Sequence, residues 1–124
     1  MGKKRRKSVL DKAQHRAWVF YRHWRKTGSK CPAFKYEMIY VTRIGWDHLV
    51  DPRKHRTTKE KIRRFEALPL AKKLLEMSTT YQEYRQDHGI SFWAFQATLD
   101  GRKIKVIVSA KNKNKCFLSV IVFK

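Results

Sequence analysis

Two histidines of this chain lie in a short segment rich in cations. His48 and His55 stand on either side of an Asp51-Pro52 break, and the cations beside them are Arg53, Lys54 and Arg56. Imidazole takes and gives protons near neutral pH, and nearby cations lower its pKa, which favours the neutral form that acts as a base. Lys and Arg hold phosphate groups beside such a base. The segment predicts acid–base chemistry on a phosphodiester, and the alternative is a pair of surface or packing histidines.

Cutting a phosphodiester without a metal requires a base for the attacking hydroxyl, an acid for the leaving oxygen and cations for the charged transition state. The chain has only ten Asp and Glu, and no cluster of them resembles a two-metal nuclease site. We therefore expect no metal and no cofactor. Lys105 and Ser119 are candidates to bind the phosphate, with a solvated lysine as the alternative for Lys105. Arg85 is a further candidate, and Glu83 is either an alternative base or the partner of an ion pair.

The charge of the chain indicates the class of partner. Thirty Lys and Arg against ten Asp and Glu give a net charge of +20 on 124 residues. Self-repulsion of that size favours a polyanion as the companion, so we expect RNA or DNA. Residues 1–62 hold eighteen basic and five acidic residues, net +13, and residues 63–124 hold twelve and five, net +7. The predicted phosphate-binding residues are Lys3, Lys4, Arg5 and Arg6 in an N-terminal arm, Arg53, Lys54 and Arg56, and Arg102 and Lys103.

Helical periodicity dominates the first two thirds of the chain. Apolar residues at steps of three and four predict an amphipathic helix from about Ser8 to Lys26. A strand over residues 37–41 comes next, and Thr42 then caps a brief helix that ends at Asp51-Pro52. Thr57 and Glu60 predict a capping box for a third helix, which Pro69 breaks and restarts. Leu74, Leu75 and Met77 are predicted core residues of the last helix.

A period of two from residue 80 onward predicts β-structure. Strands are expected over residues 81–85, 90–99, 102–109 and 116–123, and Asp100-Gly101 predicts a tight hairpin. That turn pairs Leu99 with Arg102 and places Gln96 opposite Lys105. Continuing the alternation puts Leu118, Val120 and Val122 in the core, and it puts Phe117, Ser119, Ile121 and Phe123 on the polar face. Trp46 and Phe117 are candidates to stack on bases.

These elements indicate an α+β fold in which N-terminal helices pack on one face of a four-stranded antiparallel β-meander. Residues 1–37 form a basic arm and an amphipathic helix, and residues 38–124 form the α+β domain, as one compact unit. The segments contain no membrane span or secretory signal, so we expect a cytoplasmic protein and a monomer. Cys31 and Cys116 are read as reduced thiols, with a single disulfide left open.

Several short motifs from Met38 to Lys124 are similar to those of one nuclease superfamily. They are the Trp-x-His turn within residues 42–48, Leu-Pro-Leu-Ala at 68–71, Thr-Thr-x-x-Glu-Tyr-Arg at 79–85, the Asp-Gly hairpin and Phe-Leu-Ser-Val-Ile at 117–121. Together they resemble the barnase/EndoU/colicin/RelE-like nucleases, most closely a toxin branch associated with phages and mobile elements. The chain departs from the pattern because no histidine lies near the start of its last strand.

The resemblance implies a metal-independent endoribonuclease that cuts RNA by attack of the 2′-hydroxyl and leaves a cyclic phosphate. It assigns His48 to the family's histidine after the first strand and Ser119 to its hydroxyl position on the last strand. Lys105 or Arg102 corresponds to the basic position on the preceding strand, and Arg85 is a further residue carried over from the family. It also implies an acidic antitoxin or immunity protein as a partner. The alternative from a different class is a non-catalytic basic module that binds nucleic acid on a ribosome or in a phage.

Overall fold

The computed structural model describes residues 8–123, so the predicted arm with Lys3, Lys4, Arg5 and Arg6 lies outside the described range. Four α-helices occur in this range: α1 (Val9–Thr27), α2 (Arg43–Val50), α3 (Thr58–Glu66) and α4 (Leu68–Met77). Two short 3-10 turns, η1 (Pro32–Phe34) and η2 (Pro52–Lys54), lie between them. The strands are β1 (Ser29–Cys31), β2 (Glu37–Tyr40), β3 (Glu83–Asp87), β4 (Ile90–Leu99), β5 (Arg102–Ala110) and β6 (Lys115–Val122).

Side chains cap the starts of three helices, and two of these caps, Thr42 and Thr57, were predicted. A reciprocal capping box joins Ser8 and Asp11 at the start of α1, and the Thr42 hydroxyl accepts a hydrogen bond from the Ile44 amide at the start of α2. The Thr57 hydroxyl accepts the Glu60 amide hydrogen at 3.2 Å, which is half of the capping box expected there. Pro69 lies in the first turn of α4, where it costs no helical hydrogen bond.

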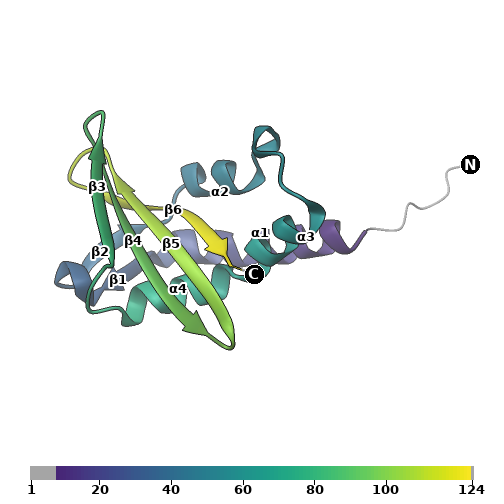
Figure 1. Cartoon of the computed structure of the whole chain (residues 1–124), viewed down its shortest axis with the longest axis horizontal. Helices are drawn as coiled ribbons and strands as arrows, with labels where there is room; N and C mark the ends of the chain where they lie inside the picture. Colours follow the sequence, from purple (N-terminus) through teal and green to yellow (C-terminus); the bar gives the residue numbers. More distant parts are fainter. Residues whose placement is uncertain (1–7, 124) are drawn as a thin grey trace, which may run out of the picture.

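The α+β class is confirmed, but the predicted four-stranded antiparallel meander is wrong. The sheet has six strands in the order β1-β2-β6-β5-β4-β3, and β2 runs parallel to β6 (Figure 1). The meander from β3 to β6 forms as expected, and β1 and β2 extend it beyond β6. The parallel pairing of β2 and β6 joins segments some 75 residues apart in the chain, and no local pattern signals such a contact.

The β4–β5 hairpin has the predicted register, whereas β6 departs from it. Leu99 pairs with Arg102 and Gln96 with Lys105, around Asp100 and Gly101 with positive φ. Between β5 and β6 the register shifts at Ile107/Val108, so that Ser119 pairs with Ile107 but Phe117 pairs with Val108. Leu118 is therefore the extra residue of a β-bulge.

The bulge reverses two predicted positions. Phe117 is 1% exposed and lies in the core, not on the polar face, and its burial removes it as a base-stacking candidate. Leu118, predicted to be core, lines a pocket on the other face of the sheet. Met77 is a further correction, because it is 54% exposed at the end of α4.

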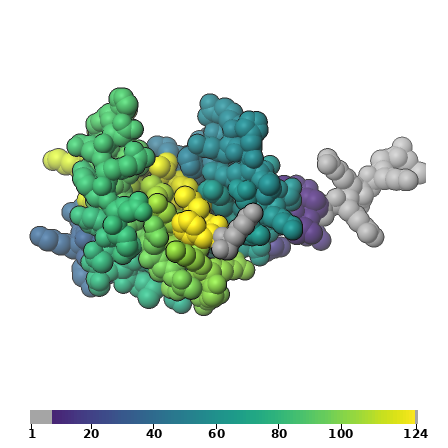
Figure 2. Space-filling model, in the orientation of Figure 1, coloured from purple at the N-terminus to yellow at the C-terminus, as the bar shows by residue number. Residues whose placement is uncertain are grey.

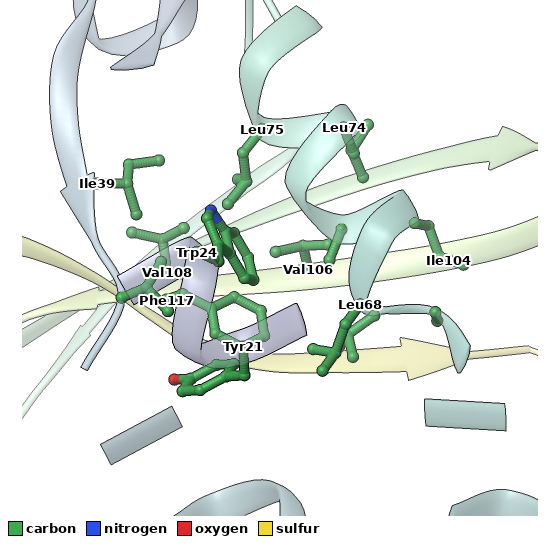
Figure 3. Packing of buried hydrophobic residues seen from close by; sticks show 14 of the residues in the cluster. Tyr21, Trp24, Ile39, Leu68, Leu74, Leu75, Ile104, Val106, Val108 and Phe117 are labelled. Carbon is green, nitrogen blue, oxygen red and sulfur yellow. The ribbon is translucent and has the colours of Figure 1, made fainter. Parts of the chain in front are cut away.

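One hydrophobic cluster connects α1, α4 and the sheet (Figure 3). Tyr21 and Trp24 of α1 pack against Phe117, with ring centroids 6.2 Å and 4.8 Å away. Leu68 and Leu75 of α4 are fully buried in the same cluster. The cluster contains residues from before and after residue 37, so the two predicted parts of the chain share one core. Helices α1 and α4 cover one face of the sheet, and the candidate site lies on the other face. Both cysteines are free thiols.

Candidate active site

A pocket of about 340 Å³ lies on the face of the sheet that α1 and α4 leave uncovered. Figure 2 shows the molecule hollowed between the green β3–β4 end and the teal α2–α3 segment, with yellow β6 at the floor. Four of the five predicted catalytic residues line the pocket, together with Glu83. They are His48, Arg85, Lys105 and Ser119, from α2, β3, β5 and β6.

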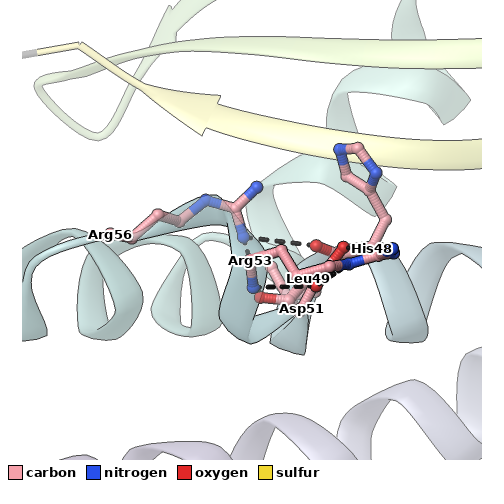
Figure 4. Close-up of polar contacts among 5 residues, drawn as sticks. All are labelled: His48, Leu49, Asp51, Arg53 and Arg56. Atoms are coloured by element: carbon pink, nitrogen blue, oxygen red, sulfur yellow. Dashed lines mark hydrogen bonds and ion pairs between the residues drawn. The ribbon is translucent and has the colours of Figure 1, made fainter.

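His48 reaches the pocket because α2 packs closely on β6. A Cβ atom on Gly45 would lie 2.8 Å from the Phe117 carbonyl oxygen and 2.5 Å from the Tyr21 hydroxyl, so only glycine permits this approach. Tyr21 also donates a hydrogen bond to the Thr42 carbonyl, which fixes the start of α2. His48 follows Gly45 by three residues and thus lies on the same side of the helix. Figure 4 shows its ring pointing from α2 toward β6.

The cations of η2 and α3 shape the electrostatics at His48. Partial burial lowers the pKa of His48, and the positive charges of Lys54, Arg56 and Arg64 lower it further. The Arg56 guanidinium donates to the carbonyls of His48 and Leu49 at 3.2 Å and 2.9 Å and so closes the C-terminus of α2 (Figure 4). The expected neutral imidazole is therefore supported by the surroundings, and it is suited to accept a proton near pH 7.

Lys105 and Glu83 form the central ion pair of the pocket. The Lys105 ammonium lies 3.2 Å from each Glu83 carboxylate oxygen, although the two strands that carry them are separated by β4. Gln96 of β4 donates to the same carboxylate at 3.1 Å. The Lys105 side chain is 22% exposed and that of Glu83 55% exposed. Lys105 is thus a positioned, partly enclosed ammonium, and the ion pair considered for Glu83 is present, with Lys105 as the partner.

Arg85 and Ser119 line the pocket from β3 and β6, which β4 and β5 separate in the sheet. The Arg85 guanidinium stacks 4.4 Å from the centroid of the Phe92 ring and lies 3.7 Å from an Asp87 carboxylate oxygen. Ser119 is 7% exposed, and the bulge at Leu118 sets its position on β6. A phosphate in the pocket would therefore meet one hydroxyl and two cations from separate strands.

The remaining predicted site residues lie outside this pocket. His55 is exposed, has a positive φ of 49° and ends η2, and it does not line the pocket with His48. Arg53 pairs with Asp51, and hydrogen bonds from Arg53 lower the pKa of that carboxyl to about 2. Lys54 lies beside His55 on the same exposed turn.

Arg102 and Lys103 belong to the far, hairpin end of β5, where Lys103 lies 5.4 Å from the centroid of the Phe123 ring. They flank the sheet face without entering the pocket. Arg56 likewise acts through the backbone of α2 and does not line the pocket. Within residues 8–123, the cations predicted to bind nucleic acid therefore lie outside the pocket lining.

Three contributions to the site were not predicted. Phe92 lies under Arg85, and its even spacing from Gln96 along the predicted strand is the signal that could have identified it. Leu118 enters the pocket through the bulge, which has no local signal. Arg64 of α3 donates to the Val120 carbonyl of β6 at 3.2 Å and so holds α3 near the pocket.

Within residues 8–123, no three His, Cys, Asp or Glu side chains gather in a group that could hold a metal ion. No helix in the same range is long and apolar enough to cross a membrane. Comparison of the chain with models of protein families, with curated proteins and with solved structures finds no match. The assignment of function therefore depends on the chemistry of the pocket itself.

Proposed function

We propose that the protein is a metal-independent endoribonuclease of the toxin type, which cuts RNA by attack of a 2′-hydroxyl on the adjacent phosphodiester. The observation that carries the proposal is the meeting of His48, Lys105, Arg85 and Ser119 in one pocket. These are the residue types that the reaction requires, and four different elements supply them. The charge of +20 supports a polyanionic substrate.

The proposed reaction follows from the side chains in the pocket. Neutral His48 accepts the proton of the 2′-hydroxyl, the 2′-oxygen bonds to phosphorus, and the bond from phosphorus to the 5′-oxygen breaks. Arg85 and the Ser119 hydroxyl bind the phosphate oxygens and stabilise their added charge. Lys105, which Glu83 holds in place at 3.2 Å, donates a proton to the leaving 5′-oxygen. The products are a 2′,3′-cyclic phosphate and a 5′-hydroxyl.

An acidic antitoxin or immunity protein is the partner that this proposal requires, because a free ribonuclease would harm its own cell. Such a protein would bind over the pocket by charge complementarity. The chain should then be toxic when it is expressed alone and tolerated beside its acidic partner.

A non-catalytic nucleic-acid-binding module is the second candidate. The observation that favours it is the pairing of the pocket's own charges, since Lys105 is bound to Glu83 and Arg85 lies near Asp87. In that case the ion pairs only stabilise the sheet, and other cations of the chain bind the RNA backbone without cutting it. Both candidates predict binding that weakens with salt, so affinity alone does not separate them.

Incubation of end-labelled RNA with the full chain in excess EDTA separates the two candidates. We expect cleavage with cyclic-phosphate ends, and we expect His48→Ala, purified identically, to lower the rate by about 10²- to 10⁴-fold, because it removes the base. His55→Ala is the matched control and should cut within about threefold of the wild type, since loss of an exposed side chain removes none of this acid–base chemistry.

Three outcomes would count against the enzyme. Intact RNA that stays bound to the wild type would establish the binding module. Cleavage only with added magnesium would overturn the metal-independent reaction. Equal loss of activity in His48→Ala and His55→Ala would show that the pocket does not define the reaction.

A further inference from the structure

A second hollowed surface lies between α1 and α2. One hollow of about 450 Å³ is lined by Gln14, His15 and Trp18 of α1, by Trp46 of α2 and by Asp11. A second, of about 290 Å³, continues from Trp18 along α1. We call the two together the tryptophan groove, and its second half is lined by Trp18, Arg22, Arg25 and Lys26.

Two indole rings line the tryptophan groove: Trp18 lines both of its hollows and Trp46 lines the first. The ring centroids of Trp18 and Trp46 are 4.9 Å apart, and both side chains are only partly buried. Trp46 also rests on Tyr21 and Phe65, at 5.5 Å and 5.9 Å, so its ring is held in place by the core beneath it. The groove therefore offers rigid aromatic surface that the protein's own side chains leave partly open.

The cations of the groove differ from those of the pocket because they have no carboxylate partner among residues 8–123. None of the seven ion pairs in that range contains Arg22, Arg25 or Lys26, and all three side chains are exposed. Asp11, the acid of the groove, accepts the Ser8 amide hydrogen at the start of α1. The unpaired positive charge makes an anionic ligand the complementary one.

Helix α2 separates the tryptophan groove from the candidate active site. Trp46 and His48 are two residues apart, which places them on nearly opposite sides of the helix. His48 points toward β6 (Figure 4), and Trp46 lines the groove against α1. A third hollow, lined by Ile44, Asp47, His48 and Arg53 among others, crosses the outer side of α2. This third hollow shares His48 and Leu118 with the active-site pocket and continues it onto the exposed side of α2.

We propose that the tryptophan groove is a second binding subsite for single-stranded RNA, in which one base stacks on the Trp18–Trp46 pair and the neighbouring phosphates contact Arg22 and Arg25. The inference rests on the proposed function, since it assigns more of the same RNA strand. Aromatic rings beside a positive groove are the usual means of binding single strands without sequence preference. A duplex hides its bases from such rings, and an acidic peptide has no flat π-surface to stack on them, so both fit the groove less well.

The test measures binding of a fluorescein-labelled 2′-O-methyl oligouridylate 12-mer to the full chain at 0.1 M salt. This probe has no 2′-hydroxyl and cannot be cut. We expect Arg22→Gln/Arg25→Gln to weaken binding by about tenfold and to lower the slope of log affinity against log salt by about 1.4, as loss of two contacts to a single strand requires. Lys111→Gln/Lys113→Gln removes the same charge from the exposed β5–β6 turn and should bind within about twofold of the wild type.

Stacking is tested separately by tryptophan fluorescence. The 12-mer should quench the tryptophan fluorescence of the wild type, and Trp46→Phe, which keeps an aromatic ring in the core, should lose a distinct part of that quenching.

Equal affinities of the two double variants for the 12-mer would overturn the subsite, as would a loss of affinity in Arg22→Gln/Arg25→Gln that is confined to a 12-base-pair RNA duplex or to a poly-glutamate peptide. Wild-type protein that cuts RNA while Arg22→Gln/Arg25→Gln binds normally would refute the subsite alone. Normal groove behaviour without any cleavage would refute the enzyme alone.

Discussion

The pocket and the tryptophan groove both present cations, but they hold them in different ways. In the pocket Lys105 contacts Glu83 at 3.2 Å and Arg85 stacks on Phe92 at 4.4 Å, so each cation has a defined direction. In the groove Arg22 and Arg25 are exposed and unpaired within the described chain. The difference indicates that net charge alone does not distinguish a catalytic site from a binding surface. Oriented cations can stabilise the charge of a transition state, whereas unpaired exposed cations attract the nucleic-acid backbone in general.

Of the changes considered, Gly45→Ala should have the largest effect on stability and activity, because it displaces α2, the helix that lines both the pocket and the tryptophan groove. A Cβ at this position would lie 2.8 Å from the Phe117 carbonyl oxygen. We expect a loss of stability of about 1–3 kcal/mol from the overpacked contact, despite the better helix propensity of alanine. Urea denaturation measures the loss, and the RNA-cutting activity of the folded fraction should fall with it.

Ile44→Ala is the control for this change, since it lies on the same helix and is 61% exposed. Its stability should differ from that of the wild type by less than about 0.5 kcal/mol. An unchanged midpoint for Gly45→Ala would show that α2 does not depend on close contact with β6.

Glu83→Gln tests whether pairing distinguishes the pocket from the groove, because it converts Lys105 from a paired cation into an unpaired one. We expect RNA affinity to rise by about two- to fivefold at low salt, in keeping with an exposed pair worth about 1 kcal/mol or less. Cleavage should stay within about tenfold of the wild type if His48 is the base. Both RNA binding and initial cleavage rates are measured. If binding is retained while cleavage falls by more than about a hundredfold, Glu83 is the base instead of His48.

Acidification should produce the smallest effect, and we follow it at His48 of the pocket. Burial and nearby cations lower the pKa of His48 in the folded protein below its ordinary value of 6.5. As the pH falls through about 6.5 the unfolded chain binds this proton first, so folding stability decreases toward lower pH with a slope below about 1.4 kcal/mol per pH unit. His48→Gln should flatten this part of the stability curve in denaturation measured from pH 7 to 5. A slope unchanged by His48→Gln would refute the lowered pKa.

Local signals predicted the parts of the fold that depend on neighbours in sequence. The Asp100-Gly101 turn determined which residues of β4 and β5 face each other, and this register placed Lys105 and Gln96 correctly. Periodicity located α1 to within about one residue at each end, because its apolar positions repeat every three to four residues. The same kind of evidence failed at Phe117, since strict alternation cannot foresee an extra residue in a strand.

The candidate site shows the same division. Sequence reasoning named His48, Lys105, Arg85 and Ser119 from residue type, strand parity and a family resemblance, and these four line one pocket. It also named His55 as a second acid–base histidine, and this residue ends an exposed turn outside the pocket. The two histidines have similar neighbours in sequence, and the packing of α2 on β6 is what places His48 alone of the two in the pocket.

The sequence by itself determined a strongly basic α+β chain, the ends of its helices and the register of its central hairpin, because caps, turns and periodicity act over a few residues. Tertiary structure decided the parallel pairing of β2 with β6, the bulge at Leu118 and the approach of α2 that Gly45 permits. These are contacts between distant segments, and their geometry depends on how whole elements pack. They bring His48 to the sheet face, and the two-residue spacing within α2 then turns Trp46 away from that face.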